Sequence, residues 1–404
     1  MAQPSSSFDL SRMIDPVDVK TFEHDYWEQQ PLLVQRDDPG YYAELLTLDD
    51  VDRLLTLSGP HFDNIRVVVS GKETPIQQIG QRGKYGVTNA LEAVYDHYRG
   101  GSTVVLNSLD DRWEPLQRLT NALGAEVNAG FQVNVYLTPG GGAQGFNPHY
   151  DTHDVFVAQV YGNKRWRLYG SPYALPLRDR PHSRHKKPEG YGDPEREIVL
   201  DAGDLLYLPR GTVHAASSND TASVHLTIGV HQVLWASVIQ DTLSKVFEDD
   251  VRFRSGLPMG FVRDPELRGR AEARLRELVG VVAEKLSAEE MIARTVPESM
   301  SLNTPVLRGH LRDLERLGEV RADTVLRRRA DASCHVSTTD SLVRVDFHNK
   351  TVDLPVHVAS EVEFVATASE FSAADIPGGL DAAGRLVLVR TFLREGLLTF
   401  ADRA

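Results

Sequence analysis

The sequence predicts an α+β fold, in which a β-barrel is followed by a helical segment and then by a smaller unit of mixed strands and helices. Up to about residue 232, short β-branched and apolar runs alternate with turn residues, which is typical of strands. After that point, apolar residues recur at the spacing of a helix. At 404 residues the chain also exceeds one ordinary hydrophobic core, so we expect two or three domains.

Short helices and strands are expected ahead of the barrel. The first helix is predicted to begin at Pro16 with Asp15 as its N-cap, because Asp favours the cap and Pro the first helical position. A later helix is predicted to end at Gly124, since Gly commonly follows a helix C-terminus. The expected helices cover residues 16–27, 46–57, 89–98 and 112–123, and the expected strands 31–36, 64–69 and 103–106.

The barrel proper is expected to begin at Gly130. Its predicted strands cover residues 130–137, 155–160, 166–169, 197–200, 204–208 and 223–230. The glycines at 140–142 are predicted to form a flexible turn. We do not expect them to bind phosphate, because no Lys-Ser pair or helix start follows them.

The segment from Asn147 to Trp166 holds the residues around which the chain is organised. His149 and Asp151 are two residues apart, and in an extended strand this spacing places both side chains on the same face. One more imidazole would complete a 2-His-1-carboxylate set, which leaves coordination positions open for non-haem Fe(II). The best candidate is His214, which follows the strand expected at 204–208. A chance His-x-Asp pair of solvated side chains is the alternative.

Two further residues near this motif need an interpretation. His153 shares the strand parity of His149, but along a strand every second residue rises roughly 6.6 Å, and His149 and His153 are separated by two such steps. The two rings therefore could not reach one iron at bond lengths of about 2 Å, and His153 is expected to be structural or to face the substrate cleft. Lys164 opens an aromatic strand, and a buried ammonium there needs an anionic partner, which a dicarboxylate cosubstrate would supply.

Taken in order, these segments resemble the JmjC-type, cupin-like ribosomal oxygenases, which are Fe(II)- and 2-oxoglutarate-dependent hydroxylases. The ordered set is far more specific than His-x-Asp alone, and the resemblance begins near the N-terminus. The matching positions are 26–33, 134–139, 148–151, 154–156, 159, 162, 164–166, 209–211 and 214.

The resemblance implies a double-stranded β-helix and assigns roles to individual residues. By resemblance, iron is bound by His149, Asp151 and His214. Lys164 pairs with the distal carboxylate of 2-oxoglutarate, and Asn134 helps to hold this cosubstrate, with O2 as the second one. A family hydroxyl near the cosubstrate would fall close to Gly229, which has no side chain, so Thr227 is the expected substitute.

The resemblance also implies three domains: a JmjC/cupin catalytic domain at 1–232, a helical dimerisation domain at 233–320 and a winged-helix-like domain at 321–404. A homodimer is therefore expected, and the alternative is that the helices pack against their own barrel. Helices are expected at 233–247, 264–286, from 287 onward, and at 304–317. The last domain is expected to have strands at 324–329, 341–347 and 352–354, a hairpin turn at 348–351, and helices at 360–366 and 382–395.

Composition limits the partners. The formal charge of −13 argues against broad nucleic-acid binding and suits a basic polypeptide. Acidic residues in the last domain favour a scaffold role there over DNA binding. The stretch 178–187 is rich in basic residues, and residues 179–192 are expected to form an exposed loop between barrel strands, with a binding lid as the alternative to a solvated insertion. No run is long enough to span a membrane and no signal peptide is visible, so a cytoplasmic location without a membrane partner is expected. The single Cys334 excludes an intrachain disulfide.

The expected function is hydroxylation of an amino-acid side chain of a protein or peptide, with a ribosomal protein favoured by the resemblance. Within the same chemistry, the alternatives are a hydroxylase of a biosynthetic peptide or free amino acid, and a JmjC-type demethylase. A non-enzymatic alternative is a cupin sensor whose winged helix binds DNA. A zinc-loaded hydrolytic cupin is disfavoured, because Lys164 would then lack its dicarboxylate partner.

Overall fold

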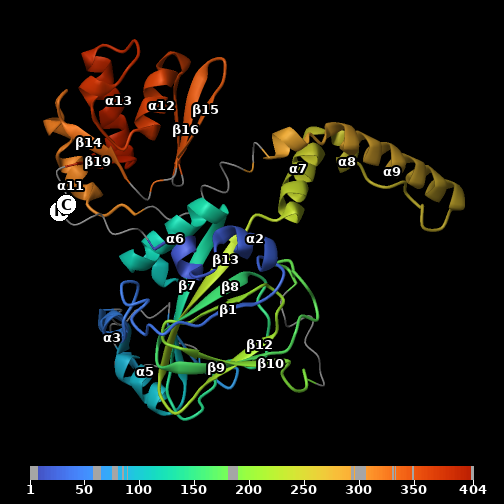
Figure 1. Ribbon diagram of the computed structural model, residues 1–404. Coiled ribbons are helices and arrows are strands. Elements are labelled where there is room, and N and C mark those ends of the chain that lie inside the picture. Colours follow the sequence, from blue (N-terminus) through green and yellow to red (C-terminus); the bar gives the residue numbers. More distant parts are fainter. Residues whose placement is uncertain are drawn as a thin grey trace.

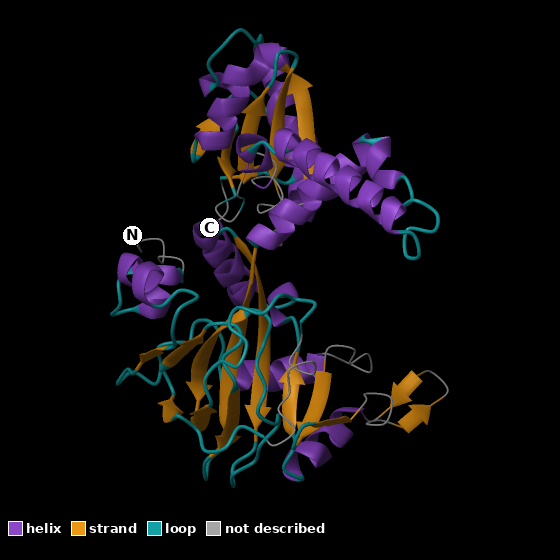
Figure 2. Cartoon of the chain, turned by 90° about the vertical axis from the view of Figure 1, so that its right-hand side faces the viewer, coloured by secondary structure: helices purple, strands orange, loops and turns teal. Residues whose placement is uncertain are grey.

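A computed structural model describes residues 8–57, 65–74, 91–180, 190–292, 295, 306–329, 332, 334–347 and 350–401, and the backbone alone of 81–83, 86–88 and 90. A β-barrel with covering helices forms the first part of the chain (Figure 1). A separate unit of strands and helices forms the last part, and both views place it apart from the barrel (Figures 1 and 2). A helical arm joins the two.

The barrel consists of two antiparallel sheets that face each other. The larger sheet has the strand order β1-β11-β8-β13-β7-β6-β2-β3, and the smaller one the order β10-β9-β12. An apolar cluster from both sheets fills part of the space between them. This arrangement confirms the predicted α+β fold with a double-stranded β-helix. The strands are β1 Leu32–Val34, β2 Ile65–Val69, β3 Lys72–Thr74, β6 Thr103–Leu106, β7 Ala129–Thr138, β8 Asp154–Tyr161, β9 Asn163–Leu168, β10 Arg196–Asp201, β11 Leu205–Leu208, β12 His214–Ser218 and β13 Ser223–Gln232; β4 Gln81–Gly83 and β5 Gly86–Thr88 form a separate hairpin.

The two faces of the larger sheet differ in chemistry because side chains alternate along each strand. Outward residues of β7 and β13, such as Val133, Val135 and Ile228, are buried against N-terminal helices in the largest hydrophobic core. Inward residues of the same strands are mostly polar, and these include Asn134, which pairs in register with Thr227. The sheet therefore has one apolar face for folding and one polar face inside the barrel. The covering helices are α1 Leu10–Ile14, α2 Val19–Asp25, α3 Leu48–Leu57, α5 Ala90–Arg99 and α6 Glu114–Val127.

Two predicted helix ends are wrong. The helix expected from Pro16 begins at Val19, and its N-cap is Asp18, whose carboxylate accepts hydrogen bonds from the backbone N–H groups of residues 20 and 21. Asp15 instead follows a separate short helix, α1. The helix expected to end at Gly124 continues to Val127, and Asn128 ends it in the left-handed region with φ of 54°. Asn tolerates this conformation better than most residues, so it serves here as Gly does elsewhere.

The helical segment after the barrel forms an arm that extends away from it (Figure 1). The arm contains α7 Trp235–Asp249, α8 Val251–Arg254 and α9 Pro265–Lys285, and no residue of α9 is buried. The alternative that these helices bury their apolar stripe against their own barrel is therefore wrong for α9. The helix expected from residue 287 lies partly outside the described residues, and the one expected at 304–317 is the shorter α11 His310–Glu315. No helix among the described residues is long and apolar enough to cross a bilayer.

The C-terminal unit has its own hydrophobic core and two three-stranded sheets, β18-β14-β19 and β15-β16-β17. The hairpin turn expected at 348–351 is only partly tested. Residues 350 and 351 belong to β17 and not to a turn, and residues 348 and 349 lie outside the described residues. The winged-helix identity of this unit stays a prediction. Its elements are α11, β14 Val325–Arg328, β15 Cys334–Thr338, β16 Leu342–Phe347, β17 Lys350–Pro355, α12 Ala359–Thr367, β18 Glu370–Ser372, α13 Ala382–Glu395 and β19 Leu398–Phe400.

Removing one partner of a buried ion pair should destabilise this unit. Arg329 Nη2 lies 2.7 Å from Asp313 Oδ2, which also accepts a hydrogen bond from Thr399. Because Asp313 is fully buried, Arg329→Met should leave a poorly compensated charge and lower the free energy of unfolding by about 3–5 kcal/mol. Thermal or urea unfolding measures this. Arg344→Met, which breaks the exposed pair with Asp353, is the control and should unfold like the wild type.

Candidate metal centre

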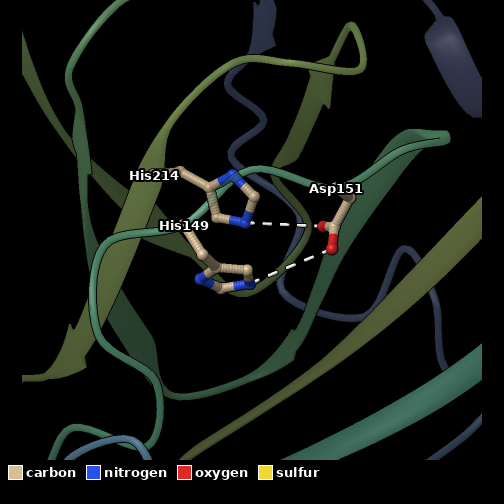
Figure 3. A group of neighbouring side chains, drawn as sticks. All are labelled: His149, Asp151 and His214. Atoms are coloured by element: carbon tan, nitrogen blue, oxygen red, sulfur yellow. Dashed lines mark ion pairs between the residues drawn. The ribbon is translucent and has the colours of Figure 1, made fainter. Parts of the chain in front are cut away.

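The structure brings together the three residues predicted to bind metal. One donor atom from each of His149, Asp151 and His214 lies within 4.8 Å of the others. The Asp151 carboxylate is 3.9 Å from His149 Nε2 and 3.7 Å from His214 Nε2, and the two imidazole rings are 4.6 Å apart between centroids (Figure 3). Such an arrangement of two imidazoles and one carboxylate suits a divalent transition metal.

The backbone that carries these ligands differs from the prediction. His149 and Asp151 do not lie in a strand but in the segment that precedes β8. His149 is held by an isolated antiparallel bridge to His214, with backbone N···O distances of 3.1 and 2.8 Å. The backbone N–H of Gly211 donates to the carbonyl of Asp151 at 3.0 Å. Contacts between the two ligand segments therefore replace the continuous strand as the rigid support.

Both imidazoles present the same nitrogen to the centre. His149 Nδ1 lies 2.8 Å from the carbonyl of Asn147, and His214 Nδ1 lies 3.0 Å from the carbonyl of Thr212. A carbonyl accepts hydrogen bonds only, so each Nδ1 carries the proton and each Nε2 keeps its lone pair for a metal. Burial, followed by the nearby His149, lowers the pKa of His214 to about 4. His214 is therefore neutral at pH 7, as metal binding requires.

Lys164 lies inside the barrel on β9, with only 4% of its surface exposed. Its ammonium donates to Thr138 Oγ1 at 2.8 Å, and no carboxylate among the described residues forms an ion pair with it. Burial lowers the pKa of Lys164 to about 7. A buried cation with a single neutral partner is costly unless an anion binds beside it. The described part of the chain thus contains no anionic partner for Lys164. A dicarboxylate bound beside Lys164 would provide one.

Asn134 and Thr227 are half-buried on the inward face of the larger sheet. Asn134 Oδ1 accepts a hydrogen bond from the backbone N–H of Ser108 at 3.0 Å, which fixes its amide. The space beside Gly229 is filled, because a Cβ there would lie 2.5 Å from the ring of His153. That ring stacks on His231, with centroids 4.9 Å apart and planes 3° apart. His153 is therefore placed against the sheet and not in the metal-binding triad.

Three aromatic residues of the barrel interior were not predicted as part of the site. The ring of His225 stacks on Tyr136, with centroids 4.8 Å apart, and meets Trp166 edge-on. Burial, then Lys164 and then His214 lower the pKa of His225, so this neutral ring lies near both the buried cation and the triad. His225 Nδ1 and Trp166 Nε1 are buried and have no hydrogen-bond partner among the described residues. The polar alternation of β7 and β13 was the signal that could have identified His225 and Tyr136.

Much of the basic stretch at 178–187 lies outside the described residues, including His182 and His185. Arg178 and Arg180 are described and exposed. Arg178 lies close enough to His231 to contribute to the lowered pKa of that ring. Whether this stretch meets a substrate stays a prediction.

A double-stranded β-helix with this triad defines a protein with a 2-His-1-carboxylate metal centre. Residues 110–238 match the family model described as JmjC domain. Among curated proteins, the chain is 32% identical over 303 residues to Ribosomal oxygenase 2 of Mus musculus, covering 71% of this chain and 62% of the relative. It is 38% identical over 262 residues to Ribosomal oxygenase 1 of Gallus gallus, covering 61% and 41%. The chain thus spans less than two thirds of these relatives.

Solved structures show the same fold. The X-ray structure of Escherichia coli ycfD superposes with a TM-score of 0.53 at 17% identity, covering 95% of this chain and 98% of that one. A second structure, of the Escherichia coli ribosomal oxygenase YcfD in complex with cobalt and 2-oxoglutarate, gives 0.51 at 16% identity, covering 96% and 99%. The JmjC match and the curated relatives support a relationship between this chain and the JmjC-type ribosomal oxygenases, and the solved structures show the shared fold. The resemblance stated from the sequence is confirmed.

Proposed function

We propose that this protein is an Fe(II)- and 2-oxoglutarate-dependent oxygenase that hydroxylates an amino-acid side chain of a protein or peptide. The observation that carries the proposal is the presence of the His149, Asp151 and His214 triad in the same barrel as a buried, unneutralised Lys164. Neither feature alone is specific. Together they provide a metal centre and, near it, a cation that needs a carboxylate.

The residues divide into two roles. His149, Asp151 and His214 would hold Fe(II) through two nitrogens and one carboxylate, which leaves coordination positions open. Lys164 would pair with the distal carboxylate of 2-oxoglutarate, and Asn134 and Thr227 would provide further polar contacts. When bound, iron and 2-oxoglutarate supply the chemistry: O2 is consumed, 2-oxoglutarate becomes succinate and CO2, and one oxygen atom enters a substrate C–H bond. The apolar cluster between the sheets includes Trp166, whose ring lies 5.8 Å from that of His214, and it would exclude water from that side of the site.

A protein substrate with basic character is favoured. Relatives are called ribosomal oxygenase, and one from Drosophila mojavensis is called a bifunctional lysine-specific demethylase and histidyl-hydroxylase. The formal charge of −13 suits a Lys- or Arg-rich partner and disfavours a nucleic acid. The demethylase, and the hydroxylase of a biosynthetic peptide or free amino acid, are the alternatives within the same chemistry. The proposed location is the cytoplasm.

The function is tested by anaerobic titration of the metal-free protein with Fe(II) and 2-oxoglutarate. A visible metal-to-ligand charge-transfer band is expected, and admission of O2 should then release succinate without added substrate. Basic proteins and peptides are screened next by mass spectrometry for the gain of one oxygen atom. If iron binds but neither band nor succinate appears, the oxygenase proposal fails and a cupin binding module becomes the better description.

We also propose that the helical arm mediates a homodimer. Large apolar side chains are exposed along it, including Trp235 on α7, and Leu275 and Val279 on α9. Leu275 and Val279 are four residues apart and lie on one helix face. A contiguous apolar face on a protruding element is typical of an association surface.

The double variant Leu275→Glu, Val279→Glu should therefore be monomeric at concentrations where the wild type is dimeric. Light scattering or sedimentation measures the mass against the chain mass of 44.9 kDa. Arg276→Ala, at an exposed position of the same helix, is the control and should stay dimeric. A monomeric wild type would contradict the proposal.

A further inference from the structure

A buried cluster of charged residues lies next to the segments that carry the metal ligands. Asp154, the first residue of β8, is fully buried and follows the ligand Asp151 by three residues. Its Oδ2 accepts a hydrogen bond from Tyr207 Oη at 2.6 Å, and its Oδ1 accepts from the backbone N–H of Arg210 at 3.0 Å and from Arg210 Nη1 at 3.2 Å. Arg210 also forms an ion pair with Glu28. We call Glu28, Asp154, Tyr207 and Arg210 the Arg210 cluster.

The cluster connects directly to two of the three ligands. Arg210 lies in the loop 209–213 between β11 and β12, and the next residue, Gly211, donates its N–H to the carbonyl of Asp151. The same loop provides the carbonyl of Thr212 that orients the ring of His214. This loop contains no strand or helix, so its position depends on these contacts together with the backbone hydrogen bonds that join Val213 to Tyr169 and Gly170. The contacts that hold Arg210 therefore help to fix the positions of Asp151 and His214 relative to each other.

Glu28 brings the N-terminal segment into this cluster. It has a φ of 57°, in the left-handed region, which costs a non-glycine residue roughly 1–2 kcal/mol. In this conformation its backbone N–H donates to Tyr207 Oη at 2.9 Å while its carboxylate meets Arg210. The preceding Trp27 stacks on the ring of Tyr207, with planes 12° apart. Several contacts thus converge on a strained residue, as is common where a site must be held in place.

We propose that Glu28 and Asp154, acting through Arg210, are positioning residues that hold Asp151 and His214 in the metal-binding arrangement. The inference rests on the proposed metal site and extends it to the N-terminal segment, which lies outside the matched JmjC region of 110–238. A buried ion pair is weak evidence for stability alone, because desolvation offsets much of its attraction. Fixing a ligand-bearing loop is a role in which such a pair has a direct effect.

The test uses full-length, metal-free protein and Co(II) as the probe. Bound Co(II) is followed by its visible d–d absorption, which reports both affinity and ligand geometry. Glu28→Ala should raise the Kd for Co(II) by about 10-fold or more, in the range typical of residues that orient metal ligands, and should change the absorption of the saturated protein. Glu44→Ala is the matched control, because it removes the ion pair with Arg12 in the same N-terminal segment without touching loop 209–213. Its Kd and absorption should equal those of the wild type.

A second variant separates the carboxylate from the backbone. Glu28→Gly accepts the positive φ without strain but lacks the carboxylate, so it should weaken Co(II) binding as Glu28→Ala does. It also keeps the proposal testable if Glu28→Ala fails to fold. A wild-type Kd and absorption in either folded variant, with at most a lower unfolding temperature, would overturn the positioning role. If the wild-type protein binds no Co(II), the proposed metal centre itself fails, which is a different result.

Discussion

Asp151→Ala should abolish iron binding and turnover. The change removes the single carboxylate of the triad and leaves two imidazoles, which are a poor site for a divalent metal. The nearest carboxylate in sequence, Asp154, is unable to replace it, because Asp154 is fully buried and already bonded to Tyr207 and Arg210. We therefore expect the iron content to fall from stoichiometric to background, and succinate formation to fall with it.

Metal content is measured by elemental analysis after anaerobic loading with Fe(II) and desalting. Asp193→Ala is the control, since Asp193 is an exposed carboxylate in the loop before β10, and it should load iron like the wild type. Near-native circular dichroism of Asp151→Ala shows that the barrel has folded. Stoichiometric iron in folded Asp151→Ala would mean that the ligand assignment is wrong.

The barrel could be predicted because its strands carry a strong local signal. Apart from Gln159 and Asp204, residues 155–160 and 204–208 are apolar, β-branched or aromatic, and both segments form strands with ends shifted by no more than one residue. The sequence of β12, His-Ala-Ala-Ser-Ser, has no such signal, and its pairing with β9 makes it a strand. The cap of α2 was misplaced because Asp15 and Asp18 are both good caps in a local pattern. Only tertiary contacts distinguish them.

The site could be predicted as far as its residues form an ordered motif. His149, Asp151, Lys164 and His214 are identified by order and spacing, even though the strand proposed to carry the first two is absent. The contact between His225 and Trp166 could not be predicted in this way, because it depends on strand pairing that brings residues far apart in sequence to one interior face. The Arg210 cluster joins residues separated by up to 182 positions. No local pattern predicts such contacts.

Lys164→Ala should remove most of the affinity for 2-oxoglutarate while leaving the iron site intact. The ammonium is buried in the barrel interior, so its loss leaves the distal carboxylate of the cosubstrate without a cation. The cost should not exceed about 3–5 kcal/mol, or roughly a 100- to 4,000-fold rise in Kd. The charge-transfer band of the anaerobic Fe(II) complex, titrated with 2-oxoglutarate, measures this Kd. Unchanged Kd in Lys164→Ala would mean that another cation binds the carboxylate.

The pH dependence of the same Kd gives an independent check on Lys164. Burial lowers the pKa of this amine to about 7 in the ligand-free protein, and only the protonated form attracts a carboxylate. Affinity should therefore be nearly constant below pH 7 and fall as the pH rises above it, by up to about tenfold per pH unit. Lys164→Arg keeps its charge throughout this range, because a guanidinium stays protonated. Its Kd should vary little between pH 6.5 and 8.5, and a slope equal to that of the wild type would show that a different group titrates.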